Sequence, residues 1–381
     1  MSIMQMMLGA GGGGDYISYS ADEVLAITTY AGNNTTNVIT NGIDLAGEGG
    51  LMLFKSYDAP YNTSWIWCDT EDKVHATVGT VTGHRKLAAS KGTGYYGNYT
   101  AYPTYAVKSL QSTGFTLGLS MIDENRSGTD IVNYTFRKAE NFFDIVTYTG
   151  NSSEQSVPHN LGRTPGMVIY KATGPASSNK SYWGVWHNSG HASGIGSEAD
   201  PPYAYFNFED SSGALANIWF AAANTGSSPW DESPPDADNL YLGWNAGIVT
   251  DQQWNESGEE YVAYIFDTDT NIIKCGSYQG TYSGNATVTG LGFQPGFLMI
   301  KAVNELTDWF IWDSVRDTTG DNIKPLKLNT NTNELNSVNF AVSFDSDGFT
   351  VKGREEGSWS GEGINYSTSK HYIYMAIADP T

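Results

Sequence analysis

Short apolar runs bounded by glycine, proline and asparagine recur along the chain, and one pattern occurs three times. A glycine-containing turn is followed by an apolar run that ends in a lysine, and a tryptophan-containing strand comes next. The copies are Leu45–Lys55, Leu161–Lys171 and Leu291–Lys301, and each lysine stands five residues after the last turn glycine. Uninterrupted apolar runs of this length after a turn are typical of buried strands. The pattern therefore predicts a repeated unit built from strands.

Two further landmarks extend the repeat beyond this segment. A tyrosine two residues before a glycine precedes each lysine, as in Tyr30-Ala31-Gly32, and an asparagine-led triplet near the end of each copy stands nine residues before a tyrosine. These closing tyrosines are Tyr134, Tyr264 and Tyr374. We expect three tandem units at 22–140, 141–270 and 271–381, preceded by a flexible Gly/Met-rich arm at 1–21. A period of this length matches a whole domain better than a solenoid repeat.

The fold predicted from these patterns is all-β. Long segments with apolar residues at helical spacing are missing, while 43 glycines, 24 tyrosines and 11 tryptophans indicate turns and aromatic strands. We therefore expect three tandem antiparallel β-sandwich units, lectin-like or jelly-roll-like. Asp345–Gly348 predicts a hairpin turn between strands at 338–344 and 349–352. If the repeated tryptophans are core residues, Trp312→Ala should destabilise its unit by about 3–5 kcal/mol.

The net charge, the hydropathy and the cysteines limit the classes of partner and of covalent cross-link that we expect. The formal net charge is −21 with only 20 lysines and arginines, which argues against a nucleic-acid partner. No apolar stretch reaches the roughly 20 residues that a membrane-spanning helix needs. Cys68 and Cys275 stand at non-equivalent places within apolar strands, so we expect buried free thiols and no disulfide.

The loops that differ between units are the candidates for recognition. Lys91–Tyr105 places five tyrosines on a glycine-rich frame, a composition seen in adaptable binding loops. The expected partner is a glycan or a protein on the host cell surface. Because aromatic rings stack on sugar faces, contacts with a glycan are expected at Tyr95, Tyr96, Tyr99, Tyr102, Trp230 and Asp231. The alternative is that these rings fill interfaces between subunits, where Tyr and Trp are also enriched.

Metal-binding and catalytic patterns are weak. His187 and His191, with Glu198 and Asp200 downstream, lack a helix and a fixed third ligand, so we expect a polar loop. The acidic loop at 229–238 leaves bound Ca²⁺ as the one cofactor alternative, although it lacks the ligand spacing of an EF-hand. The motifs sought for nucleophilic, phosphate-binding and metalloprotease sites are missing. Acid pairs that would suit a glycosidase are Asp313 with Asp317 and Glu355 with Glu356. We expect no catalytic residues, no bound metal and no enzyme.

Several segments together carry a resemblance to a known family. The opening at Met4–Gly12 and the stretches Asn41–Lys55, Tyr134–Asn151, His159–Lys171 and Gly290–Lys301 resemble virion structural proteins of marine tailed bacteriophages, cyanophages among them, which are often labelled tail-fibre-like. The resemblance implies a non-enzymatic virion protein that serves as a tail fibre or receptor-binding component for host attachment. It also implies docking to other virion proteins, for which the N-terminal arm is the candidate, and a homotrimer. The alternatives are a capsid or neck decoration protein and a glycan-degrading tailspike.

Overall fold

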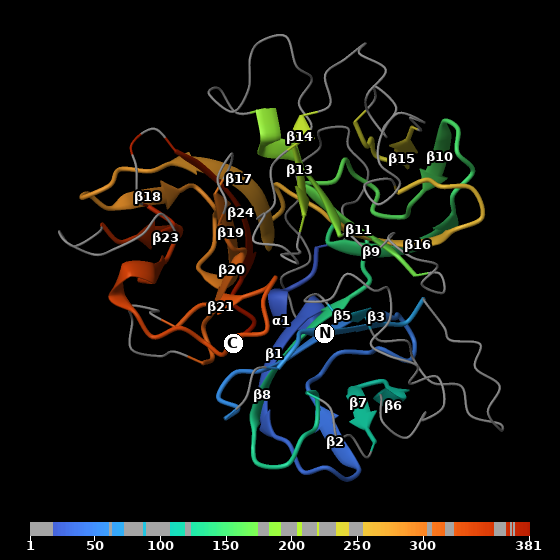
Figure 1. Cartoon of the computed structure of the whole chain (residues 1–381), viewed down its shortest axis with the longest axis horizontal. Coiled ribbons are helices and arrows are strands. Elements are labelled where there is room, and N and C mark those ends of the chain that lie inside the picture. Colours follow the sequence, from blue (N-terminus) through green and yellow to red (C-terminus); the bar gives the residue numbers. More distant parts are fainter. Residues whose placement is uncertain are drawn as a thin grey trace, which may run out of the picture.

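The structure is a computed structural model. It describes residues 18–60, 63–71, 87–88, 107–118, 123–173, 183–191, 204–207, 219–220, 234–243, 254–302, 307–316, 324–353, 363–365, 368 and 370–381. Antiparallel strands make up nearly all of its regular structure, so the all-β prediction is confirmed. Figure 1 shows three lobes around a common centre, coloured blue to teal, green to yellow, and orange to red.

Lobe 1 contains β1 to β8. Its large sheet has the order β1-β8-β3-β4-β5 and its small sheet the order β2-β7-β6. The strands are β1 (Leu25–Ala31), β2 (Asn37–Thr40), β3 (Gly50–Ser56), β4 (Ile66–Asp69), β5 (Leu87–Ala88), β6 (Val107–Gln111), β7 (Gly114–Leu117) and β8 (Asp130–Arg137). A short helix, α1 (Ala21–Val24), leads into β1. The Ser20 amide donates to the Glu23 carboxylate at 2.8 Å, so regular structure begins within the predicted arm.

Lobe 2 contains β9 to β16. Its large sheet has the order β14-β13-β12-β11-β16-β9, and β10 pairs with β15 in its small sheet. The strands are β9 (Phe143–Thr149), β10 (Gln155–Pro158), β11 (Met167–Ala172), β12 (Gly184–His187), β13 (Ala204–Asn207), β14 (Trp219–Phe220), β15 (Asn239–Leu242) and β16 (Glu260–Phe266). A single 3-10 turn, η3 (Asn188–His191), follows β12.

Lobe 3 contains β17 to β24. Its large sheet has the order β17-β24-β19-β20-β21 and its small sheet the order β18-β23-β22. The strands are β17 (Ile273–Gln279), β18 (Ala286–Thr289), β19 (Pro295–Ala302), β20 (Phe310–Asp313), β21 (Leu326–Lys327), β22 (Val342–Asp345), β23 (Gly348–Val351) and β24 (His371–Ala378). In every lobe the last strand lies between the first strand and the strand that contains the repeated lysine.

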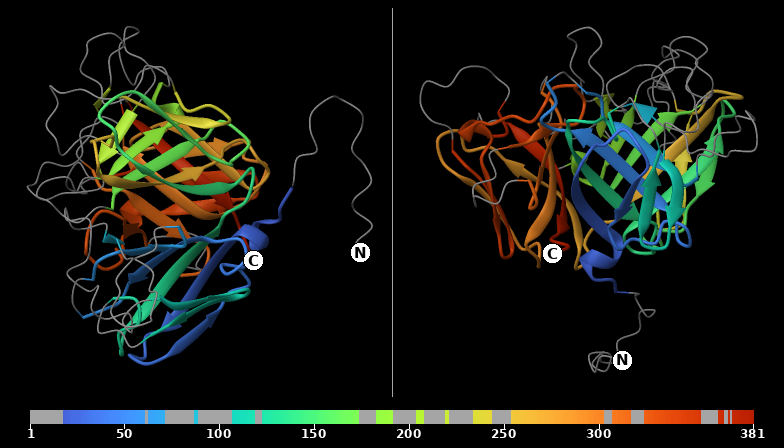
Figure 2. Two further views of the ribbon diagram at one scale, coloured as in Figure 1. Left: turned by 90° about the vertical axis from the view of Figure 1, so that its right-hand side faces the viewer. Right: turned by 90° about the horizontal axis from the view of Figure 1, so that it is seen from below.

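The large sheets face the centre of the molecule and the small sheets lie outside them (Figures 1 and 2). In β3, Leu51 and Leu53 belong to a core that residues of all three lobes share, whereas Met52 and Phe54 pack in the separate core of lobe 1. Alternate residues of a strand point to opposite faces of the sheet. All seven residues of β3 are therefore buried, and the sequence shows an apolar run instead of an alternating pattern.

Two local predictions can be compared with the structure directly. The hairpin at Asp345–Gly348 is present, with Phe344 opposite Phe349. Its first strand is shorter than predicted, because η5, a 3-10 turn at Val338–Phe340, stands where the strand was expected to begin. Cys68 and Cys275 are buried free thiols, as predicted.

Candidate functional site: the contacts between lobes

The six residues predicted to bind a glycan lie outside the described residues. They are Tyr95, Tyr96, Tyr99, Tyr102, Trp230 and Asp231. The same holds for most of the N-terminal arm, for Glu198 and Asp200, and for the acids Asp317, Glu355 and Glu356. The candidate site that the described residues do form lies inside the molecule, where the lobes meet.

Two residues weighed for metal binding or catalysis have internal partners. The buried His187 approaches the Tyr374 carbonyl through Nε2 at 3.1 Å, and its Nδ1 accepts a hydrogen bond from the Ser189 amide. Burial lowers the pKa of His187 to about 4. The buried Asp313 carboxylate accepts hydrogen bonds from Tyr134 and Arg316. Both side chains therefore tie one part of the chain to another.

The acidic loop considered for Ca²⁺ is described from Pro234 onward. Asp236 accepts hydrogen bonds from the amides of Asp238 and Asn239 at 2.8 Å, and the Tyr241 hydroxyl donates to it at 2.5 Å. These three donors make Asp236 the centre of a turn. Among the described residues, no group of three or more His, Cys, Asp or Glu side chains is placed to hold a metal ion.

The repeated lysines are fully buried in all three lobes. Lys55 donates to the Thr63 carbonyl, and Lys301 donates to Thr307 Oγ1 and to the Ala302 carbonyl, each at 3.1 Å. Lys171 lies with Nζ 5.4 Å from the centre of the Trp183 ring. Burial lowers the pKa of Lys55 and of Lys301 to about 7, although the nearby Asp123 and Asp308 oppose the shift. In lobes 1 and 3, the lysine fixes the segment that leads into the next strand.

The repeated asparagines clamp each lobe in the same way. Asn125 Nδ2 donates to the carbonyls of Thr35 and Gly118, and its Oδ1 accepts from the Asn33 amide. Asn255 and Asn365 make corresponding bonds in lobes 2 and 3. Each clamp joins the turn after the first strand to the small sheet. The three turns share a residue with positive φ, namely Asn34, Ser152 and Tyr282.

The first glycine landmark packs against this clamp. A Cβ at Gly32 would lie 2.1 Å from the Arg126 carbonyl oxygen, and one at Gly150 would lie 2.2 Å from the Glu256 carbonyl oxygen. A side chain has no room at either position. In lobes 1 and 2, the glycine landmark and the asparagine-led landmark therefore lie against each other in one backbone contact.

Hydrogen bonds of one kind join neighbouring lobes. The Tyr134 hydroxyl in lobe 1 donates to Asp313 in lobe 3 at 2.6 Å, and the Tyr264 hydroxyl in lobe 2 donates to Asp69 in lobe 1 at 2.7 Å. In each pair the tyrosine lies in the last strand of its lobe and the aspartate ends β20 or β4. The third contact differs, because His187 ends β12 and meets the backbone of β24.

The cause of this difference is a one-residue shift in lobe 3. Lys55 pairs with Val132, Lys171 with Val262 and Lys301 with Ile373, so the residue equivalent to Tyr134 and Tyr264 is Met375. The expected equivalence of Tyr374 is wrong. Side chains of consecutive residues point to opposite faces of a sheet, and the Tyr374 ring packs at 5.1 Å against Phe349 of its own lobe.

Aromatic rings fill the centre between the lobes. Trp67 lies 4.6 Å from Trp183, and Phe136 lies 5.5 Å from Phe266 and 5.6 Å from Phe297, measured between ring centroids. Phe136 thus contacts both other lobes. Paired rings of this kind stabilise a core beyond the effect of their buried area alone.

The tryptophans after the lysines play two roles. Trp65, Trp183 and Trp309 belong to the shared core, whereas Trp186 packs in the separate core of lobe 2. Trp312 is buried, and its Nε1 donates to the Phe340 carbonyl at 3.0 Å. The side chain whose replacement was expected to destabilise lobe 3 is therefore a core residue.

The contact between lobes 1 and 3 contains a buried charge network. Arg316 Nε donates to Asp313 at 2.6 Å, and its Nη1 donates to Glu334 at 3.0 Å and to the Lys324 carbonyl at 3.0 Å. The Asp313 and Glu334 carboxylates raise the pKa of Arg316 although burial opposes them. The Glu334 amide then donates to the Tyr57 carbonyl of lobe 1. The charged groups all belong to lobe 3, and the network reaches lobe 1 through the Tyr134 hydroxyl and the Tyr57 carbonyl.

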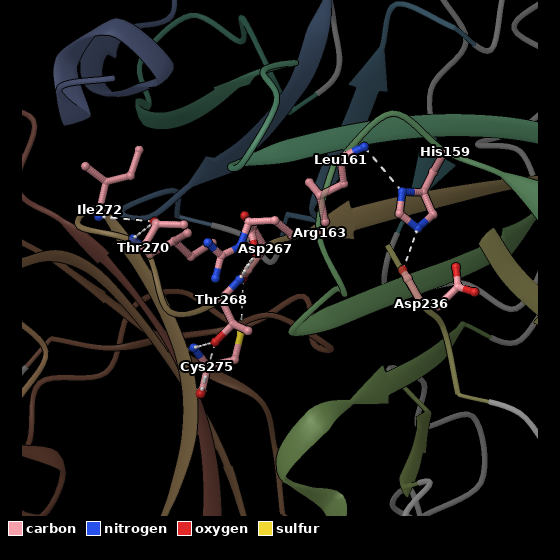
Figure 3. Close-up of polar contacts among 10 residues, drawn as sticks. His159, Leu161, Arg163, Asp236, Asp267, Thr268, Thr270, Ile272 and Cys275 are labelled. Atoms are coloured by element: carbon pink, nitrogen blue, oxygen red, sulfur yellow. Dashed lines mark hydrogen bonds and ion pairs between the residues drawn. The ribbon is translucent and has the colours of Figure 1, made fainter. Parts of the chain in front are cut away.

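A different arrangement occurs between lobes 2 and 3 (Figure 3). Asp267 follows β16 and is fully buried; its Oδ1 accepts from the Thr268 amide at 2.6 Å and lies 3.5 Å from Arg163 Nε. Its Oδ2 accepts no hydrogen bond from a described residue. Burial raises the pKa of Asp267 to about 7, with the Thr268 amide and Arg163 acting against the shift.

These contacts define the class of protein before any relative is considered. It is a three-lobed β-sandwich protein. The recurring lysines of lobes 1 and 3 and the recurring asparagines of all three lobes bind backbone groups, and a single core joins the lobes. The chain belongs to the family of a domain of unknown function, DUF7483, whose family model matches residues 56–380. No curated protein matches the chain. Among the described residues, no helix is long and apolar enough to cross a membrane.

Sequence reasoning missed the ties between lobes. The only signal was an aspartate that closes the strand after the lysine in two of the three copies, at Asp69 and Asp313. That signal became meaningful only once the register of the last strands was known.

Proposed function

We propose that this chain is a non-enzymatic structural protein of the virion of a tailed bacteriophage, and that it forms part of the tail apparatus that attaches the particle to its host. The sequence resemblance supports this function. The observation that carries it is that the lysines, asparagines and tryptophans repeated between units are used as internal ties and core residues. A repeated framework of this kind supports a rigid body that presents loops.

The position of the protein on the particle tests the proposal. Antibodies raised against the purified chain and labelled with gold should bind the tail of intact particles, and the purified chain should reduce adsorption of particles to host cells by competing for the receptor. Particles that carry none of the chain would overturn the proposal.

The alternative is a capsid or neck decoration protein, and one observation favours it. The three lobes cover one another's large sheets within a single chain, so those faces need no further copy of the chain. The proposed homotrimer would have to form through other surfaces. Light scattering separates the two proposals, since a trimer supports a fibre and a monomer at micromolar concentration supports decoration.

The proposed receptor contact rests on the tyrosine loop at 91–105. Replacing Tyr95, Tyr96 and Tyr99 together with serine should abolish adsorption while leaving the oligomeric state unchanged. Adsorption that survives in the assembled variant would remove this loop from the receptor site, and loss of assembly would assign it to an interface between subunits.

One of the acids that were candidates for a glycan-degrading tailspike does not fit that role. Asp313 is buried against Arg316 and the Tyr134 hydroxyl, so its carboxylate is not exposed to a sugar. Incubation of the purified chain with host polysaccharide, followed by size-exclusion chromatography, tests this alternative, which a shortened polysaccharide would support.

A further inference from the structure

The segment between lobes 2 and 3 is short and closely packed. Asp267, Thr268 and Cys275 lie on either side of the turn that joins β16 to β17. The Asp267 amide donates to the Phe142 carbonyl at 2.9 Å, and the Cys275 amide donates to Thr268 Oγ1 at 3.0 Å. A Cβ at Gly166 would lie 2.6 Å from Thr268 Cβ and 2.9 Å from Cys275 Sγ, so β11 and β17 meet here without spare room.

The groups that face Asp267 do not compensate a negative charge. Arg163 approaches one carboxylate oxygen at 3.5 Å and has 31% of its side chain exposed, so solvent weakens its effect. Among the described residues on the lobe 3 side, the ionisable groups that interact with Asp267 include Asp269, in the same turn, and the buried Cys275 thiol. On β9, Asp144 pairs with Ile265, two positions before Asp267, and its own carboxylate is bonded to the amides of Ile145 and Asn160.

We propose that Asp267 makes the junction between lobes 2 and 3 sensitive to protons. When it is protonated, the Asp267 side chain is neutral and accepts a hydrogen bond from the Thr268 amide. Without the proton, a charge is buried beside one backbone donor, one distant guanidinium and an oxygen that accepts no hydrogen bond from a described residue. A buried charge without sufficient partners destabilises the state that buries it. Loss of the proton therefore weakens the contact of lobe 3 with lobe 2.

The direction of the effect follows from proton binding. Burial raises the pKa of Asp267 to about 7 in the folded chain, above the ordinary value of roughly 3.9 for an unfolded aspartate. The folded state therefore binds more protons between these two values, and its stability falls as the pH rises through this window. From this group alone, the unfolding equilibrium constant should rise by up to about a thousandfold between pH 4 and pH 8.

Substitution of Asp267 with asparagine tests the proposal, because asparagine has the shape of the protonated acid and cannot ionise. Thermal unfolding of wild type and Asp267→Asn is measured from pH 4 to pH 9. Near pH 4 the two should melt together, the variant should become progressively more stable than wild type between about pH 4 and pH 7, and the difference should level off above pH 7. A constant difference across this range would overturn the proposal.

Asp269→Asn is the matched control. Asp269 is exposed two residues away and has a positive φ of 58°, a conformation that asparagine also accepts. This variant removes the same charge and should keep the pH dependence of wild type. If both variants change the profile equally, the effect belongs to net charge and the proposal fails. Lys55 and Lys301 have lowered pKa values, so they make stability rise with pH above about 7. Their contribution is the same in wild type and both variants, and it therefore drops out of the comparison.

A measurement on the wild-type chain keeps the test valid if Asp267→Asn does not fold. Infrared difference spectra should show a protonated carboxyl group that loses its proton between pH 6 and pH 8, while every ordinary carboxyl group has ionised at lower pH. Hydrogen exchange, corrected for the intrinsic effect of pH, should show weaker protection of the amides from Thr268 to Cys275 at pH 8 than at pH 6. A spectrum without such a carboxyl group would overturn the proposal.

Discussion

Lobe 3 meets its two neighbours through contacts that bury acids in opposite ways. Against lobe 1, Asp313 has the Tyr134 hydroxyl, the Arg316 guanidinium and two backbone amides as donors. Against lobe 2, Asp267 has one amide and a guanidinium at 3.5 Å. The first carboxylate is compensated by its partners, and the second is not.

The difference follows the path of the chain. Lobes 2 and 3 are consecutive, and the backbone between Phe266 and Ile273 holds them together. Lobes 1 and 3 have no direct connection, so only their contact surface closes the ring. A covalent link acts as a high effective concentration and can maintain a contact that contains a destabilising group. The unlinked contact depends on its own interactions, and its polar groups are correspondingly well paired.

The largest effect is expected from breaking the unlinked contact. Asp313→Ala should lower the free energy of unfolding by about 3–5 kcal/mol, because it leaves Arg316 buried without its main partner. Chemical denaturation monitored by tryptophan fluorescence would measure the change. Asp345→Ala is the control, since this half-buried acid in the same lobe accepts one hydrogen bond, from Thr350, and should cost about 1 kcal/mol. Equal losses would show that the network does not hold the lobes together.

A smaller effect is expected from removing single hydroxyl groups between lobes. Tyr134→Phe and Tyr264→Phe each keep the ring and lose one hydrogen bond to a buried carboxylate, which should cost about 1.5–3 kcal/mol. Tyr374→Phe should cost less, because that ring faces its own lobe. Thermal unfolding of the three variants tests the register. A loss at Tyr374 as large as the other two would contradict the one-residue shift.

The smallest effect is a coupling between two positions at the third contact. Met375→Tyr with His187→Asp would place there the pair that joins the other lobes. The double variant should be more stable than the sum of the single changes predicts, by about 1 kcal/mol. A double-mutant cycle of unfolding free energies measures this coupling. A coupling of zero would mean that the third contact has a different geometry.

The sequence predicted the parts of the fold that depend on local pattern. The all-β class followed from the apolar runs and turns, and the hairpin at Asp345–Gly348 followed from turn chemistry. The importance of the repeated lysine and asparagine could also be read from their spacing, although their roles as clamps could not. Those roles depend on partners such as Gly118 and Thr63, which the sequence does not mark.

The remainder depended on facts that no local pattern contains. The apolar runs indicated burial of β3, β11 and β19, but not that residues of all three strands would join one core shared by the lobes. Tyr374 stands nine residues after Asn365, as Tyr134 stands after Asn125, yet one extra residue in the last segment turns it to the opposite face. The loops predicted to bind a glycan lie outside the described residues, so those contacts stay a prediction.

The shared core has a consequence for how such a protein can change in number of copies. In a solenoid, each repeat touches only its neighbours, so evolution can lengthen or shorten the array by one copy at a time. Here each lobe touches both of the others, and Phe136 alone reaches Phe266 and Phe297. Deleting a lobe would expose apolar residues on the large sheets of the other two lobes, and a further lobe could enter this core only by displacing one of the three. A change in the number of lobes would therefore require the shared core to be rebuilt, whereas a solenoid gains or loses a repeat without such a change.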